Sequence, residues 1–277
     1  MAFFFIMISF PNAKINLGLN ILSKREDGYH NISSCFYPVP WCDILEIIPS
    51  NHLKFTSSGI NIPGDESNNL CIQAYHLLNR DFNIPKVHIH LHKIIPIGAG
   101  LGGGSSDCAF TLKMLNDMFC LNLSDDQLES YAGKLGSDCP FFIKNIPTLV
   151  SGTGNQFEHT KLSLTGNSIV LVYPKIHIST QQAYAGIVPN IPEQSISDIL
   201  NLPISKWKSK LKNDFESSVI ETHLDIVSIK EHLYDNDALY TSMSGSGSAV
   251  YGIFENKVAG NLLDHLSKKY VTWSHQL

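Results

Sequence analysis

The sequence predicts an α+β fold in two domains. Stretches with helical and with strand patterns alternate irregularly, without the regular strand–helix–strand spacing of a doubly wound sheet. The 277 residues are enough for two domains of ordinary size, whose cores need neither a disulfide nor a structural metal. A glycine-rich stretch at 151–154 precedes a new strand pattern, so we expect an N-terminal domain over 1–160 and a C-terminal domain over 161–277.

The first strands are expected near the N-terminus. Met7 opens a short strand, and two apolar runs, 13–22 and 44–48, are bounded by Gly, Pro or Asp, as strands usually are. A polar turn, 24–30, lies between these runs. Residues 1–6 lack the basic flank and the long apolar core of a targeting segment, and whether Met1 or Met7 is the native start stays open.

A helix and a half-buried strand follow. Apolar residues over 69–80 recur at close to helical spacing, whereas those over 87–91 alternate with polar residues. The polar residues of this alternation are three histidines: His88, His90 and His92. We interpret them as the solvent side of an edge strand rather than as a zinc site, because no fourth ligand is evident.

Two further helices are expected after a glycine-rich loop. The first presents apolar residues on one face over 109–118. The second opens with a capping box, Ser124 with Gln127, and Gly136 is placed to end it. Asp138 is therefore expected just beyond the end of a helix.

The C-terminal part contains a second glycine-rich loop. A strand over 169–173 comes first, and further helical patterns lead to the loop at 243–248. A strand over 250–254 and a closing helix over 257–270 follow. We find no internal repeat.

Composition excludes several classes of partner. The net charge of −5 gives no general electrostatic attraction to nucleic acid or to an anionic membrane, and no run approaches the length of a membrane span. The six cysteines show no CxxC pair or repeated spacing, so we expect reduced thiols in a cytoplasmic protein.

The first glycine-rich loop is typical of phosphate binding. Its glycines let the backbone approach an anion, and the helix that follows offers free N–H groups and the positive end of its dipole. A Walker A loop would need a GK[ST] ending, and a dinucleotide fold would need an acidic strand end about twenty residues later; neither is present. The loop comprises Pro96, Ile97, Gly98, Ala99, Gly100, Leu101, Gly102, Gly103, Gly104, Ser105 and Ser106.

Three segments together resemble the motifs of the GHMP kinase superfamily, in the same order. They are Pro11–Leu19, Pro96–Ser106 and Met243–Ala249. Two further segments, Arg25–His30 and Leu135–Phe142, resemble the branch that phosphorylates a cytidine diphosphate-linked methylerythritol. The likeness extends over nearly the whole chain, although Ala99 stands where relatives usually have glycine.

This resemblance implies a fold and an activity. It implies an N-terminal domain like ribosomal protein S5 domain 2, a C-terminal GHMP kinase domain, and ATP with Mg²⁺ as cofactor. It also implies transfer of the γ-phosphoryl group to the 2-hydroxyl of the cytidylyl substrate in the non-mevalonate isoprenoid pathway. Such transfer depends mainly on positioning, charge neutralisation and a base near the hydroxyl.

The resemblance also implies roles for individual residues. Asp138 accepts the hydroxyl proton and Lys14 lies beside it, keeping that carboxylate ionised. The residues expected at the cytidylyl substrate are Asn16, Tyr29, His30, Tyr184, Ser244 and Gly245, and those expected at the adenine end of ATP are Asn69 and Lys93. Asn69 could instead cap a helix, and Lys93 could be a solvated strand end.

Two alternatives remain open. Another GHMP kinase, of the homoserine or phosphomevalonate type, would keep Lys14 and Asp138 but leave Tyr29 and His30 without a role. A non-catalytic nucleotide-binding protein could use the same scaffold. In each case we expect a small-molecule partner, no nucleic acid or membrane partner, and a monomer or weak homodimer.

Overall fold

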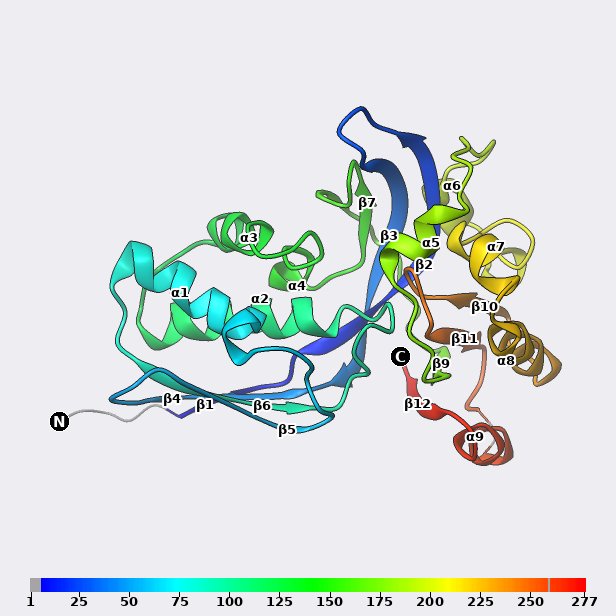
Figure 1. Cartoon of the computed structure of the whole chain (residues 1–277). Coiled ribbons are helices and arrows are strands. Elements are labelled where there is room, and N and C mark those ends of the chain that lie inside the picture. The colour runs from blue at the N-terminus through cyan, green and yellow to red at the C-terminus, as the bar shows by residue number, and fades with distance from the viewer. Residues whose placement is uncertain (1–5, 259) are drawn as a thin grey trace. The chain divides into compact units, whose positions relative to one another are not determined.

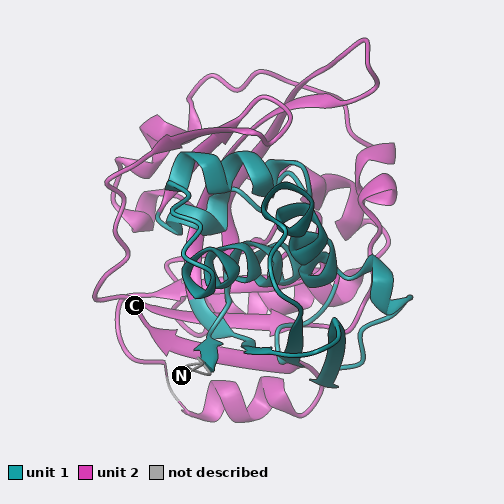
Figure 2. Ribbon diagram, turned by 90° about the vertical axis from the view of Figure 1, so that its left-hand side faces the viewer, with its two compact units in different colours: residues 1–13, 40–97, 102–146 teal, residues 14–39, 98–101, 147–277 magenta. Residues whose placement is uncertain are grey.

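The computed structural model describes residues 6–258 and 260–277, which form two compact units (Figures 1 and 2). Unit 1 consists of residues up to 13, 40–97 and 102–146, and unit 2 consists of 14–39, 98–101 and 147–277. The predicted halves, 1–160 and 161–277, are continuous, whereas these units are interleaved because long strands and the glycine-rich loop pass from one to the other. Within the described ranges, no helix has the length and apolar character needed to cross a membrane.

Unit 1 is built on a four-stranded sheet in the order β1-β4-β6-β5. Its strands are β1 (Met7–Ser9), β4 (Ile44–Pro49), β5 (Lys54–Gly59) and β6 (Val87–Lys93). The pairs β1–β4 and β4–β6 are antiparallel and β5–β6 is parallel. The expected strands beginning at Met7 and over 44–48 are confirmed.

Helices cover one face of this sheet (Figure 1). They are η1 (Glu66–Asn68), α1 (Leu70–Phe82), α2 (Gly103–Met118), α3 (Asp125–Gly133) and α4 (Phe141–Lys144). The capping box at Ser124 is confirmed, with the Ser124 hydroxyl accepting from the Gln127 N–H and the Gln127 side chain accepting from the Ser124 N–H. The helix ends at Gly133 rather than Gly136. The N–H groups of Lys134 and Leu135 bond the carbonyls three residues earlier, not four as in an α-helix.

The other face of the sheet carries the three histidines. Val87, Ile89 and Leu91 are buried against the helices, which confirms the alternation. The expectation of an edge strand is wrong, because β6 lies between β4 and β5. Two hydroxyls of β5 join the imidazoles into a ladder: Thr56 bonds His88 and His90, and Ser58 bonds His90 and His92, over 2.8–3.0 Å. Hydroxyl groups of β5 therefore partner all three imidazoles.

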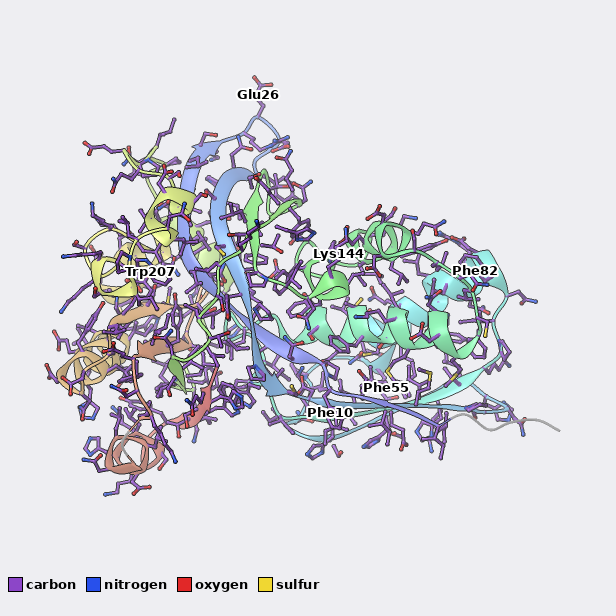
Figure 3. All side chains as sticks on the ribbon, turned by 180° about the vertical axis from the view of Figure 1, so that it is seen from behind. Phe10, Glu26, Phe55, Phe82, Lys144 and Trp207 are labelled. Atoms are coloured by element: carbon purple, nitrogen blue, oxygen red, sulfur yellow. The ribbon has the colours of Figure 1, made fainter. Side chains whose placement is uncertain are left out.

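Unit 2 contains two four-stranded sheets. The first has the order β2-β3-β7-β8, with strands β2 (Asn12–Lys24), β3 (His30–Cys42), β7 (Thr148–Ser151) and β8 (Gln156–His159). The second has the order β10-β11-β9-β12, with strands β9 (Ser168–Tyr173), β10 (Tyr240–Met243), β11 (Val250–Phe254) and β12 (Val271–Gln276). The turn between β2 and β3 carries Glu26 at its exposed tip (Figure 3).

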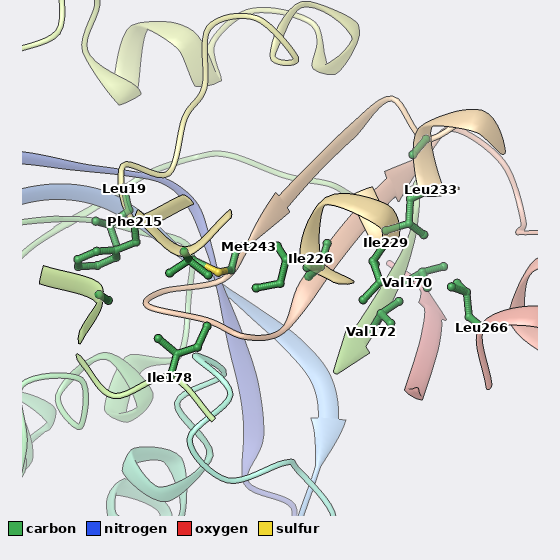
Figure 4. Packing of buried hydrophobic residues seen from close by; sticks show 14 of the residues in the cluster. Leu19, Val170, Val172, Ile178, Phe215, Ile226, Ile229, Leu233, Met243 and Leu266 are labelled. Atoms are coloured by element: carbon green, nitrogen blue, oxygen red, sulfur yellow. The ribbon is translucent and has the colours of Figure 1, made fainter. Parts of the chain in front are cut away.

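The main core of unit 2 lies between the second sheet and its helices. The helices of unit 2 are α5 (Thr180–Ala185), α6 (Ile196–Leu200), η2 (Ile204–Lys206), α7 (Phe215–Ile220), α8 (Leu224–Asp235) and α9 (Gly260–Ser267), and α5, α7, α8 and α9 contribute to this core. Val170 and Val172 of β9 pack with Ile226 and Ile229 of α8 in one buried cluster (Figure 4). Tertiary packing thus fixes the short helices, which would be marginal alone.

Several strands were not expected from the sequence: β3, β5, β7, β8, β10 and β12. β3 contains Pro38 and Pro40, which obscure its pattern although six of its residues between Ser34 and Trp41 are buried. The closing helix predicted over 257–270 is shorter, Gly260–Ser267, and is followed by β12. Ala259, within that prediction, lies outside the described residues, as do residues 1–5 of the possible N-terminal extension.

Candidate active site

In unit 2, a buried hydrogen-bond network surrounds the predicted lysine. The Lys14 ammonium group donates to Asn16 Oδ1 over 2.5 Å, and Asn16 Nδ2 donates to Ser34 Oγ over 2.9 Å. Ser34 in turn donates to the Gly18 carbonyl over 2.6 Å. Lys14 is only 3% exposed and lies 4.5 Å from the centre of the Phe36 ring. The network therefore fixes the position of a cation that would be costly to bury without partners.

The middle of the glycine-rich loop packs against the loop at 243–248, also in unit 2. Ser244 Oγ donates to the Gly100 carbonyl over 2.8 Å, and the Ala249 N–H donates to the Ala99 carbonyl over 3.1 Å. A Cβ at Gly100 would collide with the Ser244 carbonyl, and φ there is +79°, so only glycine fits. Positive φ recurs at Gly98 and Gly102 but not at Ala99, which explains why alanine is tolerated there.

The side chain and the N–H group of Ser244 are already engaged in hydrogen bonds that hold the loop at 243–248. Its side chain accepts from the Asn16 N–H over 3.3 Å, and its own N–H donates to Ala249. The predicted contact of this loop with the cytidylyl substrate, which stays a prediction, is therefore better suited to Gly245 than to the Ser244 N–H.

Sequence reasoning missed Asn213, a second residue that holds this loop. Its amide donates to the carbonyls of Met243 and Gly245, each over 2.8 Å, and its Oδ1 accepts from the Phe215 N–H. Asn213 is buried and lies in an irregular stretch without a motif, so no pattern singled it out.

The residues expected at the cytosine ring are partly brought together. His30, at the start of β3, stacks on Tyr184 of α5 with ring centres 4.7 Å apart and planes 22° apart. Phe215 meets the Tyr184 ring edge-on at 4.8 Å. Tyr29 is 67% exposed and its N–H is bonded to Asp27 in the hairpin turn. The structure thus joins His30 and Tyr184, while a role for Tyr29 stays a prediction.

In unit 1, Lys93 does not lie at a solvated strand end. It is 4% exposed, and its ammonium group donates to Asp43 and Asp107, each over 2.6 Å. Burial alone would lower the pKa of Lys93, but the two carboxylates outweigh it and raise the pKa. Burial raises the pKa of Asp107 to about 7, against the attraction of the lysine. With its ammonium group engaged in this way, Lys93 is poorly suited to the predicted adenine contact.

Asn69 acts as a helix cap. Its Oδ1 accepts from the Cys71 N–H over 2.9 Å at the start of α1, as the alternative interpretation held. A contact from Asn69 to the nucleotide stays a prediction.

The first turn of α2 has the features of an anion site. Its N-terminal N–H groups have no partner within the helix, and a Cβ at Gly104 would meet no atom within 4 Å, so the helix start is open there. Ser106 Oγ is buried and makes no hydrogen bond among the described residues. Phosphate oxygens are acceptors that such N–H and O–H groups can bind.

Asp138 lies beside this helix start within unit 1. It is half-buried in the turn between α3 and α4. The next residue, Cys139, accepts hydrogen bonds from Cys108 and Ser105 of α2, and these bonds lower the pKa of its thiol against the effect of burial. Lys14 belongs to unit 2 and Asp138 to unit 1, so their pairing stays a prediction.

Comparison with known proteins agrees with this arrangement. The family "GHMP kinases N terminal domain" matches residues 69–145, and "GHMP kinases C terminal" matches 197–272. The 4-diphosphocytidyl-2-C-methyl-D-erythritol kinase of Cytophaga hutchinsonii is 56% identical, with 91% of this chain and 93% of the relative covered. That of Parabacteroides distasonis is 52% identical, with 90% and 92% covered.

Solved structures show the same fold. A crystal structure of 4-(cytidine 5'-diphospho)-2C-methyl-D-erythritol kinase superimposes with a TM-score of 0.85 at 28% identity, covering 97% of this chain and 98% of that one. The mevalonate kinase of Methanococcus jannaschii superimposes with a TM-score of 0.69 at 13% identity, covering 99% and 98%. The predicted α+β GHMP kinase fold is therefore confirmed. The chain belongs to the GHMP kinases and, within them, to the 4-diphosphocytidyl-2-C-methyl-D-erythritol kinases.

Proposed function

We propose that this protein transfers the γ-phosphoryl group of ATP to the 2-hydroxyl of 4-diphosphocytidyl-2-C-methyl-D-erythritol, in the non-mevalonate isoprenoid pathway. The relatives that cover nine-tenths of the chain carry the name of this activity. The observation that favours it over the sister kinases is the stack of His30 on Tyr184, which offers aromatic rings to a pyrimidine.

ATP binds with its phosphates at the glycine-rich loop. The open first turn of α2 supplies N–H donors and the positive end of the helix dipole, which favour an anion. The glycines allow the phosphate oxygens to approach the backbone without hindrance from a Cβ.

Mg²⁺ fits the same helix start. In kinases Mg²⁺ is bound largely by nucleotide phosphates and water, so that few protein ligands are needed. The buried Ser106 hydroxyl, unpartnered among the described residues, and the neighbouring Ser105 hydroxyl are suitable oxygen ligands. When bound, Mg²⁺ neutralises charge on the β- and γ-phosphates.

Asp138 and Lys14 act on the acceptor hydroxyl. The Asp138 carboxylate takes the proton of the 2-hydroxyl. The hydroxyl oxygen attacks the γ-phosphorus in line with the leaving oxygen of ADP. The Lys14 ammonium group, held by Asn16, offsets the negative charge of the transferring group. The reaction therefore needs few catalytic side chains, each held firmly.

The cytosine ring is recognised by stacking. The 4.7 Å separation of His30 and Tyr184 leaves no room for a third ring between them. We infer that the base takes the place of the imidazole on Tyr184, and that His30 then hydrogen-bonds the base edge. Tyr29, exposed in the neighbouring turn, closes over the other face of the base.

The test is ADP release from Mg-ATP by the purified protein with a panel of alcohols. Turnover with the cytidylyl substrate and none with homoserine or phosphomevalonate is expected. Turnover with one of those alcohols instead would favour the sister-kinase alternative. Absence of any alcohol-dependent ADP release from folded, ATP-binding protein would favour the non-catalytic one.

We further propose that the protein works on small molecules in the cytoplasm as a monomer or weak homodimer. The net charge of −5 and the absence of a basic stripe in the sequence disfavour a nucleic-acid partner.

A further inference from the structure

A buried ion cluster in unit 1 connects three separate segments of the chain. Lys93, the last residue of β6, donates to Asp43, between β3 and β4, and to Asp107 of α2. Each ion pair measures 2.6 Å, and all three side chains are at most 4% exposed. Charges this deeply buried are costly unless they are paired and hydrogen-bonded.

Asp43 fixes the first end of the glycine-rich loop. Its Oδ1 accepts from the N–H groups of Ile94 and Ile95, over 2.5 and 2.8 Å, and these two residues lead from β6 into the loop. Its own N–H donates to the Pro11 carbonyl over 2.9 Å. The carboxylate therefore holds the exit of the strand while its second oxygen holds Lys93.

Lys93 and Asp107 fix the second end. Gly103 is the first residue of α2, and a Cβ there would lie 3.0 Å from the Lys93 ammonium group and 3.1 Å from Ile95 Cγ2. The helix backbone thus packs directly against the end of β6. Asp107 then ties the second turn of the helix to the same lysine.

Stability alone does not explain this cluster. Replacing a buried ion pair by well-packed apolar side chains is often neutral or stabilising, so a charged cluster is weak evidence for a purely stabilising role. In addition, Asp107 Oδ1 has no hydrogen-bond partner among the described residues, a cost that an apolar residue would avoid. What the charges provide is direction, since both oxygens of Asp43 and Oδ2 of Asp107 each hold a defined donor at a defined place.

We propose that Asp43, Lys93 and Asp107 are positioning residues for ATP, which fix the separation of Ile95 and Gly103 and so hold the phosphate-binding backbone in its binding conformation. The inference rests on the proposed binding of ATP phosphates by this loop. A loop held in place in advance loses less conformational entropy when the nucleotide binds. Lys93 acts through the loop and makes no contact with the adenine ring.

The main experiment is the Lys93→Met substitution, which removes the charge and keeps a similar length. The KM for ATP and the Kd for ADP, measured by calorimetry, are expected to rise at least tenfold. The KM for the cytidylyl substrate should stay within twofold. Because the ion cluster acts on the binding of the phosphates and not of the base, kcat/KM should fall by the same factor for ATP and for GTP.

Asp107→Asn is the second variant. It keeps the size of the side chain and an oxygen for Lys93, so the protein is expected to fold with a smaller rise in the Kd for ADP, about threefold. The matched control is Asn116→Ala near the far end of the same helix, where Asn116 bonds both backbone groups of Leu123. It should lower the Tm without changing the affinity for ADP.

Two results would overturn the proposal. One is wild-type affinity for ADP in whichever of the two variants is folded. The other is a loss confined to Lys93→Met and accompanied by a changed preference between ATP and GTP, which would assign Lys93 to the adenine ring. Because ADP binding is measured without turnover, failure of the proposed kinase activity would be seen separately.

Discussion

Unit 1 and unit 2 hold their site residues by different means. In unit 1 the backbone at the two ends of the glycine-rich loop, our proposed phosphate site, is tied down by an ion cluster, Lys93 with Asp43 and Asp107. In unit 2 the Lys14 ammonium is held by neutral amide and hydroxyl groups, those of Asn16 and Ser34.

The difference fits what we propose each unit to bind. Backbone N–H groups can recognise phosphates, so unit 1 has to fix the backbone conformation. Charged side chains can do this without contacting the phosphate themselves. A nucleobase and an alcohol are recognised by side chains, so unit 2 has to fix rings and a single ammonium group. Changes at the ion cluster of unit 1 should therefore alter ATP binding, and changes at the aromatic rings of unit 2 should alter acceptor binding.

The largest expected effect tests whether the proton-transfer step can be lost without a change in the binding of ATP or of the acceptor. Asp138→Asn removes the proton acceptor and should lower kcat by about 10²–10⁴-fold, with both KM values within threefold of wild type. The measurement is steady-state ADP release. Asp126→Asn, a matched change on the exposed α3, should leave kcat unchanged. A kcat for Asp138→Asn close to wild type would remove Asp138 from the mechanism.

The next effect sharpens the division between the units. Tyr184→Ala removes a stacking surface worth about 1–3 kcal/mol per base, so the KM for the cytidylyl substrate should rise roughly 5–150-fold. The KM for ATP should not change. Tyr270→Ala, at a tyrosine whose hydroxyl bonds Asp225, serves as the control. An equal rise in both KM values would contradict the assignment of base recognition to unit 2.

A smaller effect probes the neutral network directly. Ser34→Ala removes a fully buried hydroxyl that accepts from Asn16 and donates to the Gly18 carbonyl. Leaving these groups unpaired should lower the free energy of unfolding by about 1–3 kcal/mol. Thermal or urea unfolding measures this loss, and Ser267→Ala at the exposed end of α9 should cost under about 0.5 kcal/mol. Equal stability of the two variants would show that the hydrogen bonds of Ser34 contribute no more to stability than those of an exposed serine.

The smallest effect lies away from both sites. Ser124→Ala breaks the capping box of α3 and should cost about 0.5–2 kcal/mol of stability. Neither KM should change. Ser124→Asp, which keeps an N-cap acceptor, should recover most of the loss. A change in the KM for ATP would mean that α3 takes part in nucleotide binding, and the comparison between the units would need revision.

Local patterns in the sequence predicted the elements that have local causes. The alternation of Val87, Ile89 and Leu91, the capping box at Ser124 and the spacing of glycines each follow from contacts within a few residues. β3 and β12 escaped prediction because each depends on a partner distant in sequence: β3 lies between β2 and the distant β7, and β12 pairs with β9. Burial between such partners overrides proline and weak periodicity.

The residues of the candidate site also divide into those with a local signal in the sequence and those whose role depends on distant segments. The glycine-rich loop was found because its composition is typical of phosphate binding, and Lys14 because its segment resembles a family motif. Asn213 and Asp43 were not found, since a single buried amide or carboxylate becomes meaningful only when the distant chain segment it holds is known. The family resemblance implied a nucleotide contact for Lys93, while only the structure reveals its two carboxylate partners.

The interleaving of the two units has a consequence for synthesis on the ribosome. The hairpin of β2 and β3 is made early, but its partner strand β7 begins only at Thr148. At about 5–20 residues per second, the emerging hairpin waits roughly 5–20 s for that partner. During this interval unit 1 receives its last residue, while apolar β-strands destined for unit 2 still lack their sheet. The nascent chain is thus most exposed to misassociation before its second half has emerged.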